Sequence, residues 1–108
     1  MICAMTARRI ADGRTDEFIS AFSNGPENIP SEIADKFTAI YACQDTKDPN
    51  IVLTFGMFDG TPEEWSEIQT NDARREQLEK IDPLVEEILI DRSFEVVREF
   101  VSEMSPAR

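Results

Sequence analysis

The sequence predicts one α+β domain whose elements follow the order β-α-β-β-α-β. Three observations carry this prediction. Short apolar runs rich in β-branched and aromatic residues are interspersed with two segments that begin as helices do. A cluster of turn-forming residues separates the two central runs, which indicates an antiparallel hairpin. The length of 108 residues suits a single core, so we expect one domain over residues 1–101 and a polar C-terminal tail over residues 102–108.

The first strand and the first helix are predicted from the N-terminal part of the chain. Residues 1–10 are apolar on both faces of a strand, so we expect a strand that is covered on both sides. The first helix begins at Thr15, a residue type that caps helices, and Asp16 and Glu17 place negative charge in its first turn. Gly25, followed by a proline, is expected to end it.

The central hairpin is expected after a loop over residues 26–36. FTAIYACQ, residues 37–44, predicts the second strand, and IVLTFGMF, residues 51–58, predicts the third. The residues between them, 45–50 (DTKDPN), are typical of a turn. The third strand therefore returns antiparallel to the second.

The second helical region has the clearest start signal in the chain. Thr61 suits the N-cap, Pro62 suits the first helical position, and Glu64 completes a capping box. Apolar residues continue to Ile81 at helical spacing, with an interruption expected near residues 70–72.

A short helix over residues 83–89 and a fourth strand over residues 93–101 complete the prediction. The result is the ferredoxin-like βαββαβ pattern, an antiparallel four-stranded sheet with the usual strand order 4-1-3-2. Cys3 and Cys43 then lie on strands that the third strand separates, beyond the reach of a disulfide. They lack the spacing of a metal site, and we expect two small buried side chains.

One face of this sheet is expected to need a partner. Both crossover helices lie on the same face of a ferredoxin-like sheet. The third strand nevertheless offers apolar residues to both faces, such as Val52 to one and Leu53 to the other, and the fourth strand over residues 93–101 shows a similar pattern. A bare apolar face of this size is unusual in a monomer. We therefore expect a two-fold homodimer that packs sheet on sheet.

Charge excludes several classes of partner. The chain has 22 acidic and 11 basic residues, a net charge of −11, and this repels nucleic acid and anionic membrane surfaces. Eleven of the acids and three of the bases fall within residues 59–91. We interpret that segment as a water-facing helical surface, with attraction of a basic partner as the alternative. The scattered acids do not form a metal-ligand pattern.

The absence of histidine excludes several chemistries. With no imidazole, the chain cannot form a Ser-His or Cys-His catalytic couple or a histidine-ligated haem site. No apolar stretch approaches the length of a membrane span, and the apolar run before Arg8 is too short for a signal-peptide core. We therefore expect a cytoplasmic protein.

Three local patterns resemble one known group. They are the opening strand followed by GRTDEF (residues 13–18), the DPN turn (residues 48–50) that leads into IVLTFGMFD, and the second helical region with Glu64-Trp65 followed by Asn71-Asp72. Together they make the chain similar to the dimeric α/β-barrel superfamily, and within it to the antibiotic biosynthesis monooxygenase-like group. The resemblance covers roughly residues 1–101.

The resemblance implies two classes of function. Members include cofactor-free monooxygenases that oxidise anthrones or quinols, haem-degrading monooxygenases, and many proteins without known activity. Trp65 matches the helical tryptophan of the haem-degrading branch. That branch also uses a histidine in the same helical region, where this chain has Arg74, Arg75 and Leu78, and an asparagine on the first strand, where this chain has Thr6. The resemblance therefore implies a cofactor-independent oxygenase for a small aromatic or quinol-like compound, with a non-catalytic small-molecule-binding or structural protein as the alternative.

The resemblance also implies an apolar cleft between the helices and the sheet, with hydrogen-bond donors and a base. Glu17 and Glu64 are the candidate bases. Three of the candidate cleft residues could instead have a purely structural role. Trp65 could belong to the core, and Tyr41 to the core or the dimer interface. Arg98 could form an ion pair. The candidate cleft-lining residues are Trp65, Tyr41, Asn71, Arg98 and Arg8.

Overall fold

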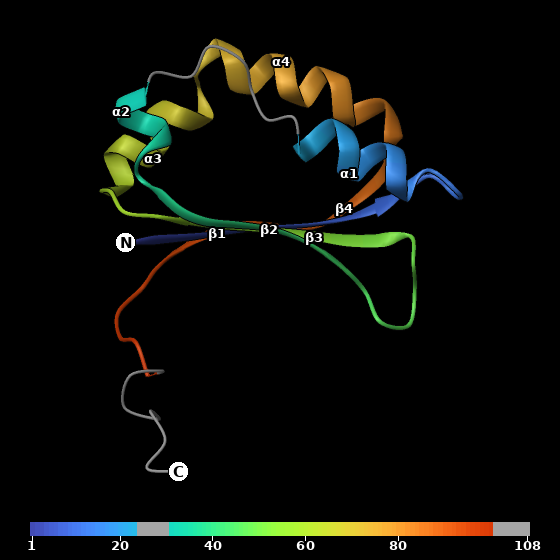
Figure 1. The fold of residues 1–108 in the computed structure, drawn as a ribbon, viewed down its shortest axis with the longest axis horizontal. Coiled ribbons are helices and arrows are strands. Elements are labelled where there is room, and N and C mark those ends of the chain that lie inside the picture. The colour runs from blue at the N-terminus through green and yellow to red at the C-terminus, as the bar shows by residue number, and fades with distance from the viewer. Residues whose placement is uncertain (24–30, 101–108) are drawn as a thin grey trace.

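Four strands form one antiparallel sheet, and the helices cover one of its faces in the computed structural model (Figure 1). The structure describes residues 1–23 and 31–100. The predicted helix end at Gly25, much of the following loop and the polar tail over 102–108 lie outside the described residues. The elements are β1 (Ile2–Ile10), α1 (Thr15–Ser23), α2 (Ser31–Ala34), β2 (Phe37–Gln44), β3 (Ile51–Phe58), α3 (Pro62–Gln69), α4 (Asp72–Ile81), a 3₁₀ turn (Asp82–Leu84) and β4 (Val85–Glu95).

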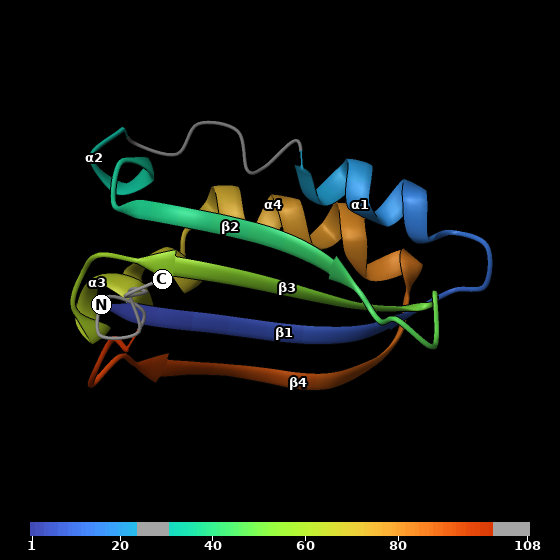
Figure 2. The same cartoon turned by 60° about the horizontal axis from the view of Figure 1, so that its bottom comes forward.

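The predicted ferredoxin-like fold is confirmed. The strands follow the order β2-β3-β1-β4, which is the expected 4-1-3-2 order read from the other edge (Figure 2). β2 and β3 have the predicted bounds. Their turn is held by the Asp45 carboxylate, which accepts hydrogen bonds from the backbone N–H groups of Lys47 and Asp48. No helix within residues 1–23 and 31–100 is long and apolar enough to cross a membrane.

The predicted interruption of the second helical region is also confirmed. α3 has the full capping box at Thr61 and Glu64 and ends at Gln69. α4 then begins at Asp72 with Asn71 as its own N-cap. The break changes the direction of the chain, so that α3 covers one end of the sheet and α4 runs along it (Figure 1).

The prediction for the last part of the chain is wrong. Residues 83–89 do not form a helix, and the fourth strand is Val85–Glu95, not residues 93–101. The Asp82-Pro83 start signal supports only one 3₁₀ turn. From Val85 the backbone pairs with β1 along its whole length, with irregularities at Ala7/Arg8 and Arg9/Ile10. Strand pairing thus outweighs the local helix signal of PLVEEIL.

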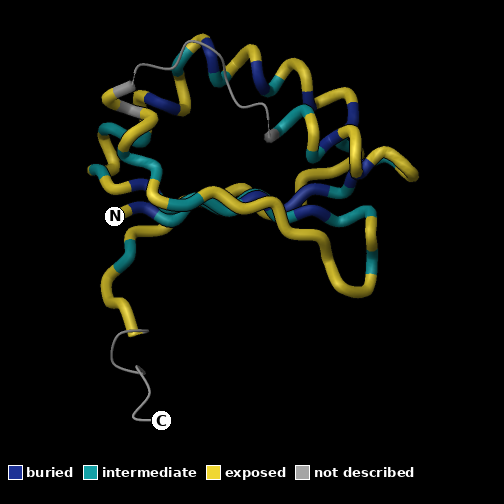
Figure 3. Tube along the Cα trace, in the orientation of Figure 1, coloured by how far each residue is buried: buried dark blue, intermediate teal, exposed yellow. Residues whose placement is uncertain are grey.

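The core forms two clusters at opposite ends of the helix-facing side of the sheet (Figure 3). One joins α1 and α4 to the sheet, and its members are Ile10, Phe18, Val52, Ile81 and Leu84. The other lies under α3, and its members are Ile2, Phe58 and Ile68, with Phe37 and Trp65 packed against them. Both clusters are built from side chains that point to the helices, because strand residues alternate between the two faces.

The helices of the described residues all lie on one face of the sheet (Figure 1), and the opposite face carries apolar side chains that none of them covers. Cys3, Met5 and Ala7 of β1 lie opposite Met57, Phe55 and Leu53 of β3. On β4, Ile90 and Phe94 continue this face with 44% and 45% of their surfaces exposed. The expected apolar face therefore exists, although its fourth strand is Val85–Glu95.

The expectation of two buried cysteines is wrong for the single chain. Cys3 is half-buried and Cys43 is exposed, and both are free thiols. Cys43 lies opposite Leu53 on the edge strand β2, on the face that no helix covers. Cys43 is therefore exposed for the same reason as the apolar side chains of this face, because none of the described helices packs against it.

Candidate functional site

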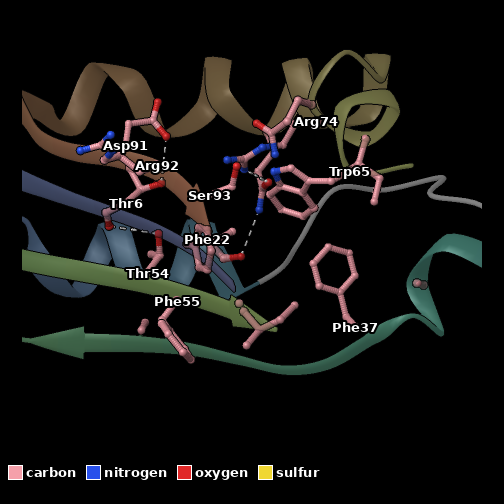
Figure 4. A pocket seen from close by; sticks show the side chains of 18 residues that line it. Thr6, Phe22, Phe37, Thr54, Phe55, Trp65, Arg74, Asp91, Arg92 and Ser93 are labelled. Atoms are coloured by element: carbon pink, nitrogen blue, oxygen red, sulfur yellow. Dashed lines mark hydrogen bonds between the residues drawn. The ribbon is translucent and has the colours of Figure 1, made fainter. Parts of the chain in front are cut away.

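A cavity of about 660 Å³ lies between the sheet and the helices (Figure 4). The two core clusters fill the ends of this layer, whereas the middle of the sheet presents small residues to it. Because such short side chains do not fill the distance to the helices, a space remains beneath the helices. The small lining residues are Ala4, Thr6, Ala42, Thr54, Gly56 and Ser93.

Trp65 forms an aromatic wall of the cavity. Its ring centroid lies 6.0 Å from that of Phe37 and 5.5 Å from that of Phe58. The capping box at Thr61 sets where α3 begins, and the buried Ile68, three residues after Trp65, faces the same side of that helix. This wall offers a flat apolar surface on which an aromatic ring can pack.

The sheet side of the cavity carries a chain of hydrogen bonds. Arg8 on β1 is 3% exposed, and its Nη1 atom donates to the Thr54 hydroxyl oxygen at 3.0 Å. That hydroxyl donates to the backbone oxygen of Thr6 at 3.3 Å, and the Thr6 hydroxyl donates to Asp91 at 3.4 Å. Asp91 supplies the carboxylate among the residues that line the cavity. The Arg8 guanidinium also lies 5.6 Å from the ring centroid of Phe18.

A second arginine, Arg74, reaches the cavity from α4 (Figure 4). Its Nη1 atom donates to the Gln77 side-chain oxygen at 2.6 Å. Gln77 is 5% exposed, and its amide nitrogen donates to the backbone oxygen of Phe22 at 3.3 Å. Gln77 thus links the Arg74 guanidinium to α1. The adjacent Arg75 is exposed and pairs with Asp72.

The surroundings shift the pKa values of both Arg8 and Arg74. Burial lowers the pKa of Arg8, and the positive charge of Arg74 lowers it further. Burial also lowers the pKa of Arg74. The charges of Asp91 and Asp82 act in the opposite direction on both pKa values. Among the described residues, neither arginine forms a salt bridge with a carboxylate.

Of the five candidate cleft residues, one lines the cavity and a second is hydrogen-bonded to a lining residue. Trp65 lines it, and Arg8 lies directly behind the lining residue Thr54. Tyr41 is on the opposite face of the sheet and is 56% exposed. Asn71 accepts a hydrogen bond from the Ala73 backbone at 2.8 Å and caps α4. Arg98 lies beyond β4, with its guanidinium 5.3 Å from the ring centroid of Phe100.

Neither candidate base lies at the cavity. Glu17 pairs with Arg14 at 2.8 Å on the exposed side of α1, and the hydrogen bond from Arg14 lowers the pKa of its carboxyl group. Glu64 completes the capping box of α3 and pairs with Lys36. Within the described part of the chain, no three acidic or cysteine side chains gather closely enough to hold a metal ion.

Sequence reasoning missed Arg74, Gln77 and Asp91 as cavity residues. A signal for the first two exists, because Arg74, Gln77 and Ile81 have the i, i+3, i+7 spacing of one helix face. That spacing separates Arg74 from Arg75, which looks equivalent in composition. Asp91 could be placed only from the register of β4, which pairs it with Thr6.

The comparisons with known proteins support the fold. The chain matches no family profile, and no curated protein matches it in sequence. It is similar in structure to a "putative antibiotic biosynthesis monooxygenase" from Chloroflexus aurantiacus J-10-fl (TM-score 0.72, 17% identity, covering 91% of this chain and 94% of that one). A protein of the same description from Deinococcus radiodurans has a TM-score of 0.72 at 10% identity, covering 92% of this chain and 95% of that one.

An uncharacterised NIPSNAP domain protein from Burkholderia xenovorans has the same architecture (TM-score 0.61, 16% identity, covering 90% of this chain and 95% of that one). The chain is therefore a ferredoxin-like α+β protein with the fold of the antibiotic biosynthesis monooxygenase-like structures. The resemblance predicted from the sequence is confirmed at this level.

Proposed function

We propose that this protein binds a small aromatic or quinol-like compound in the cavity and oxidises it with O₂, without a metal or a flavin. The observation that carries the proposal is the cavity itself, which is lined both by the aromatic wall at Trp65 and by the polar groups of Arg74, Thr6 and Asp91. Apolar walls with a few convergent polar groups are typical of small-molecule sites. Two of the similar structures are described as putative antibiotic biosynthesis monooxygenases, which supports this reaction class.

For this oxidation the protein needs only to bind the substrate, orient it and stabilise the charge that develops on it. Loss of a proton from an anthrone-type CH₂ group gives an electron-rich carbanion that reacts with O₂ directly. One oxygen atom becomes the new carbonyl and the other leaves as water, so that the CH₂ carbon supplies all four electrons that reduce O₂. Asp91 is the lining carboxylate that can accept the proton, and Arg74 is a donor for the developing oxyanion.

O₂ uptake with a panel of anthrones and quinols tests this proposal. We expect at least one compound to be consumed with O₂ uptake above the uncatalysed rate, and we expect Trp65→Ala to abolish most of it. Tyr41→Phe is the matched control, because this aromatic residue lies on the opposite face of the sheet. Uptake that is absent for the whole panel, or equal in the wild type and Trp65→Ala, contradicts the proposal. Binding without O₂ uptake supports the alternative, a non-catalytic small-molecule-binding protein.

We further propose that the protein works as a homodimer joined through the sheet face that no helix covers. The exposed apolar side chains of that face are the support, among them Tyr41, Ile90 and Phe94. Burial of such a face against a second copy removes it from water without any change in the fold. A cytoplasmic location stays a prediction.

A further inference from the structure

The floor of the cavity consists of two rows of paired residues that run across the sheet. Each row passes from β2 through β3 and β1 to β4, and every member lines the cavity. The two rows are Ile40, Gly56, Ala4 and Ser93, and Ala42, Thr54, Thr6 and Asp91. Neighbouring strands lie about 4.8 Å apart, so this floor is about 14 Å wide from one edge of the sheet to the other.

The polarity of the floor changes between the two edges of the sheet. At the β4 edge the rows end in the Ser93 hydroxyl and the Asp91 carboxylate. Arg74 is close to this edge, since the charge of Asp91 acts against the lowering of the Arg74 pKa by burial. At the β2 edge the same rows end in the hydrocarbon side chains of Ile40 and Ala42. A ligand that spans the floor therefore meets polar groups at one end and hydrocarbon at the other.

The hydrocarbon end of the cavity is open to solvent. Phe37 of β2 and Ala34 of α2 add to its apolar lining, and Figure 4 shows Phe37 and Asp91 on opposite sides of the cavity. Ile40 is 56% exposed and Ala42 is also exposed, so the described helices do not close the cavity at this edge. Such apolar surface is removed from water when a hydrocarbon group of a ligand lies on it.

A single aromatic ring occupies only part of this space. The cavity volume of about 660 Å³ lies within the range of about 300–1,000 Å³ that is typical of sites for drug-sized ligands. A ring whose oxygen groups meet the polar β4 end leaves the β2 end empty. No bulky side chain of the floor separates the two ends, because Gly56 and Ala4 lie between Ile40 and Ser93 in their row.

We infer that the ligand carries a flexible alkyl or alkenyl group, which runs from a ring on Trp65 along Ile40 and Ala42 and leaves the cavity at the β2 edge. This inference rests on the proposed function and specifies its substrate as an amphipathic compound, with oxygen groups at the β4 end and hydrocarbon at the β2 end. Each methylene that leaves water for this surface strengthens binding. The alkyl group also orients the ring, because only one end of the cavity matches it.

The test uses resorcinol and its 4-ethyl, 4-butyl and 4-hexyl derivatives, which share one ring and differ only in the length of the alkyl group. We expect the association constant, measured by isothermal titration calorimetry, to rise about two- to fourfold for each methylene. Ala42→Leu should remove most of this gain, because the larger side chain occupies the space of the alkyl group, and it should change the affinity for resorcinol little. Ile40→Gln should reduce the gain per methylene, because an amide replaces hydrocarbon.

Cys43→Leu is the matched control, since Cys43 is the next residue of β2, is exposed and lies on the opposite face of the sheet. The full gain should persist in this variant, and circular dichroism would verify that all three variants are folded. Equal affinities along the series overturn the inference. A gain that a folded Ala42→Leu variant retains also overturns it, because the alkyl group then binds elsewhere, as on the outer face of the sheet.

The same probes separate this inference from the proposed oxidation. O₂ uptake with the anthrone and quinol panel, together with equal affinities along the resorcinol series, overturns the inference alone. A gain that Ala42→Leu removes and Cys43→Leu retains, without O₂ uptake from any compound of the panel, overturns the proposed oxidation alone.

Discussion

The sequence predicts the role of some candidate site residues better than that of others. Trp65 is the single tryptophan, and its spacing to Ile68 places it on the core side of α3. The Asn71 side chain could bind a ligand by its chemistry alone, but in the structure it caps α4. Capping and ligand binding both use an asparagine at a helix start, so only the position of Asn71 relative to the cavity distinguishes them.

At the residue scale, the proposed base can be tested by Asp91→Asn. The change keeps the shape of the side chain and its capacity to accept from Thr6, but it removes the basic oxygen. We expect turnover of an active anthrone or quinol to fall by about 10²–10⁴-fold, which is the typical range for loss of a general base. Steady-state O₂ uptake measures this. Asp72→Asn is the control, because Asp72 is an acid at the exposed start of α4. Similar loss in both variants, or none in Asp91→Asn, argues against Asp91 as the base.

A second test at this scale concerns the energetic cost of Arg8. Because this guanidinium is buried without a salt bridge among the described residues, Arg8→Met should leave stability unchanged or raise it by about 1 kcal/mol or more. Urea unfolding measures the difference. In the control Arg9→Met, loss of the partly exposed pair with Asp48 should cost about 0–1 kcal/mol. A marked loss of stability in Arg8→Met instead assigns Arg8 a structural role beside Thr54 and Phe18.

Elements differ in predictability according to whether local or long-range interactions determine them. β2 and β3 have their predicted bounds, because the turn residues at 45–50 make their own hydrogen bonds. β4 was predicted wrongly because its first residues follow a helix-start signal, while its actual partner, β1, lies some eighty residues earlier in the chain. The cavity depends on this register, since it brings Asp91 and Ser93 opposite Thr6 and Ala4. The sequence could therefore indicate a cleft without naming its polar residues.

The start of α3 allows an element-scale test. Thr61→Ala removes the side-chain oxygen that accepts from Glu64, half of the capping box. We expect Thr61→Ala to lower the free energy of unfolding by about 1 kcal/mol. The control is Ser66→Ala, on the exposed side of the same helix, which should change the free energy of unfolding by close to zero. Because α3 carries Trp65, the fluorescence of this residue should report the loosening of the helix during unfolding. An equal effect of the two substitutions would show that the cap does not fix the helix.

At the scale of the whole molecule, the two faces of the sheet differ in what packs against them. One face holds the core clusters and the cavity beneath the helices, and the other carries an apolar surface that a second copy would bury. Two neighbouring residues of β2 lie on different faces. Ile40 lines the cavity, whereas Tyr41 packs near Phe55 on the opposite face. Both side chains are 56% exposed. Equal exposure on opposite faces makes them a matched pair for testing where a partner binds.

Sedimentation velocity at micromolar concentration should give a dimer for the wild type and for Ile40→Glu. Tyr41→Glu should weaken association by at least about a hundredfold, because a carboxylate left unpaired in a buried interface costs about 3 kcal/mol or more. Circular dichroism would verify that both variants are folded. Ile40→Glu should instead disturb ligand binding, since Ile40 lines the cavity. A monomeric wild type, or a dimer that Ile40→Glu weakens and Tyr41→Glu does not, would refute assembly through the outer sheet face. In either case the apolar side chains of that face would require another partner to remove them from water.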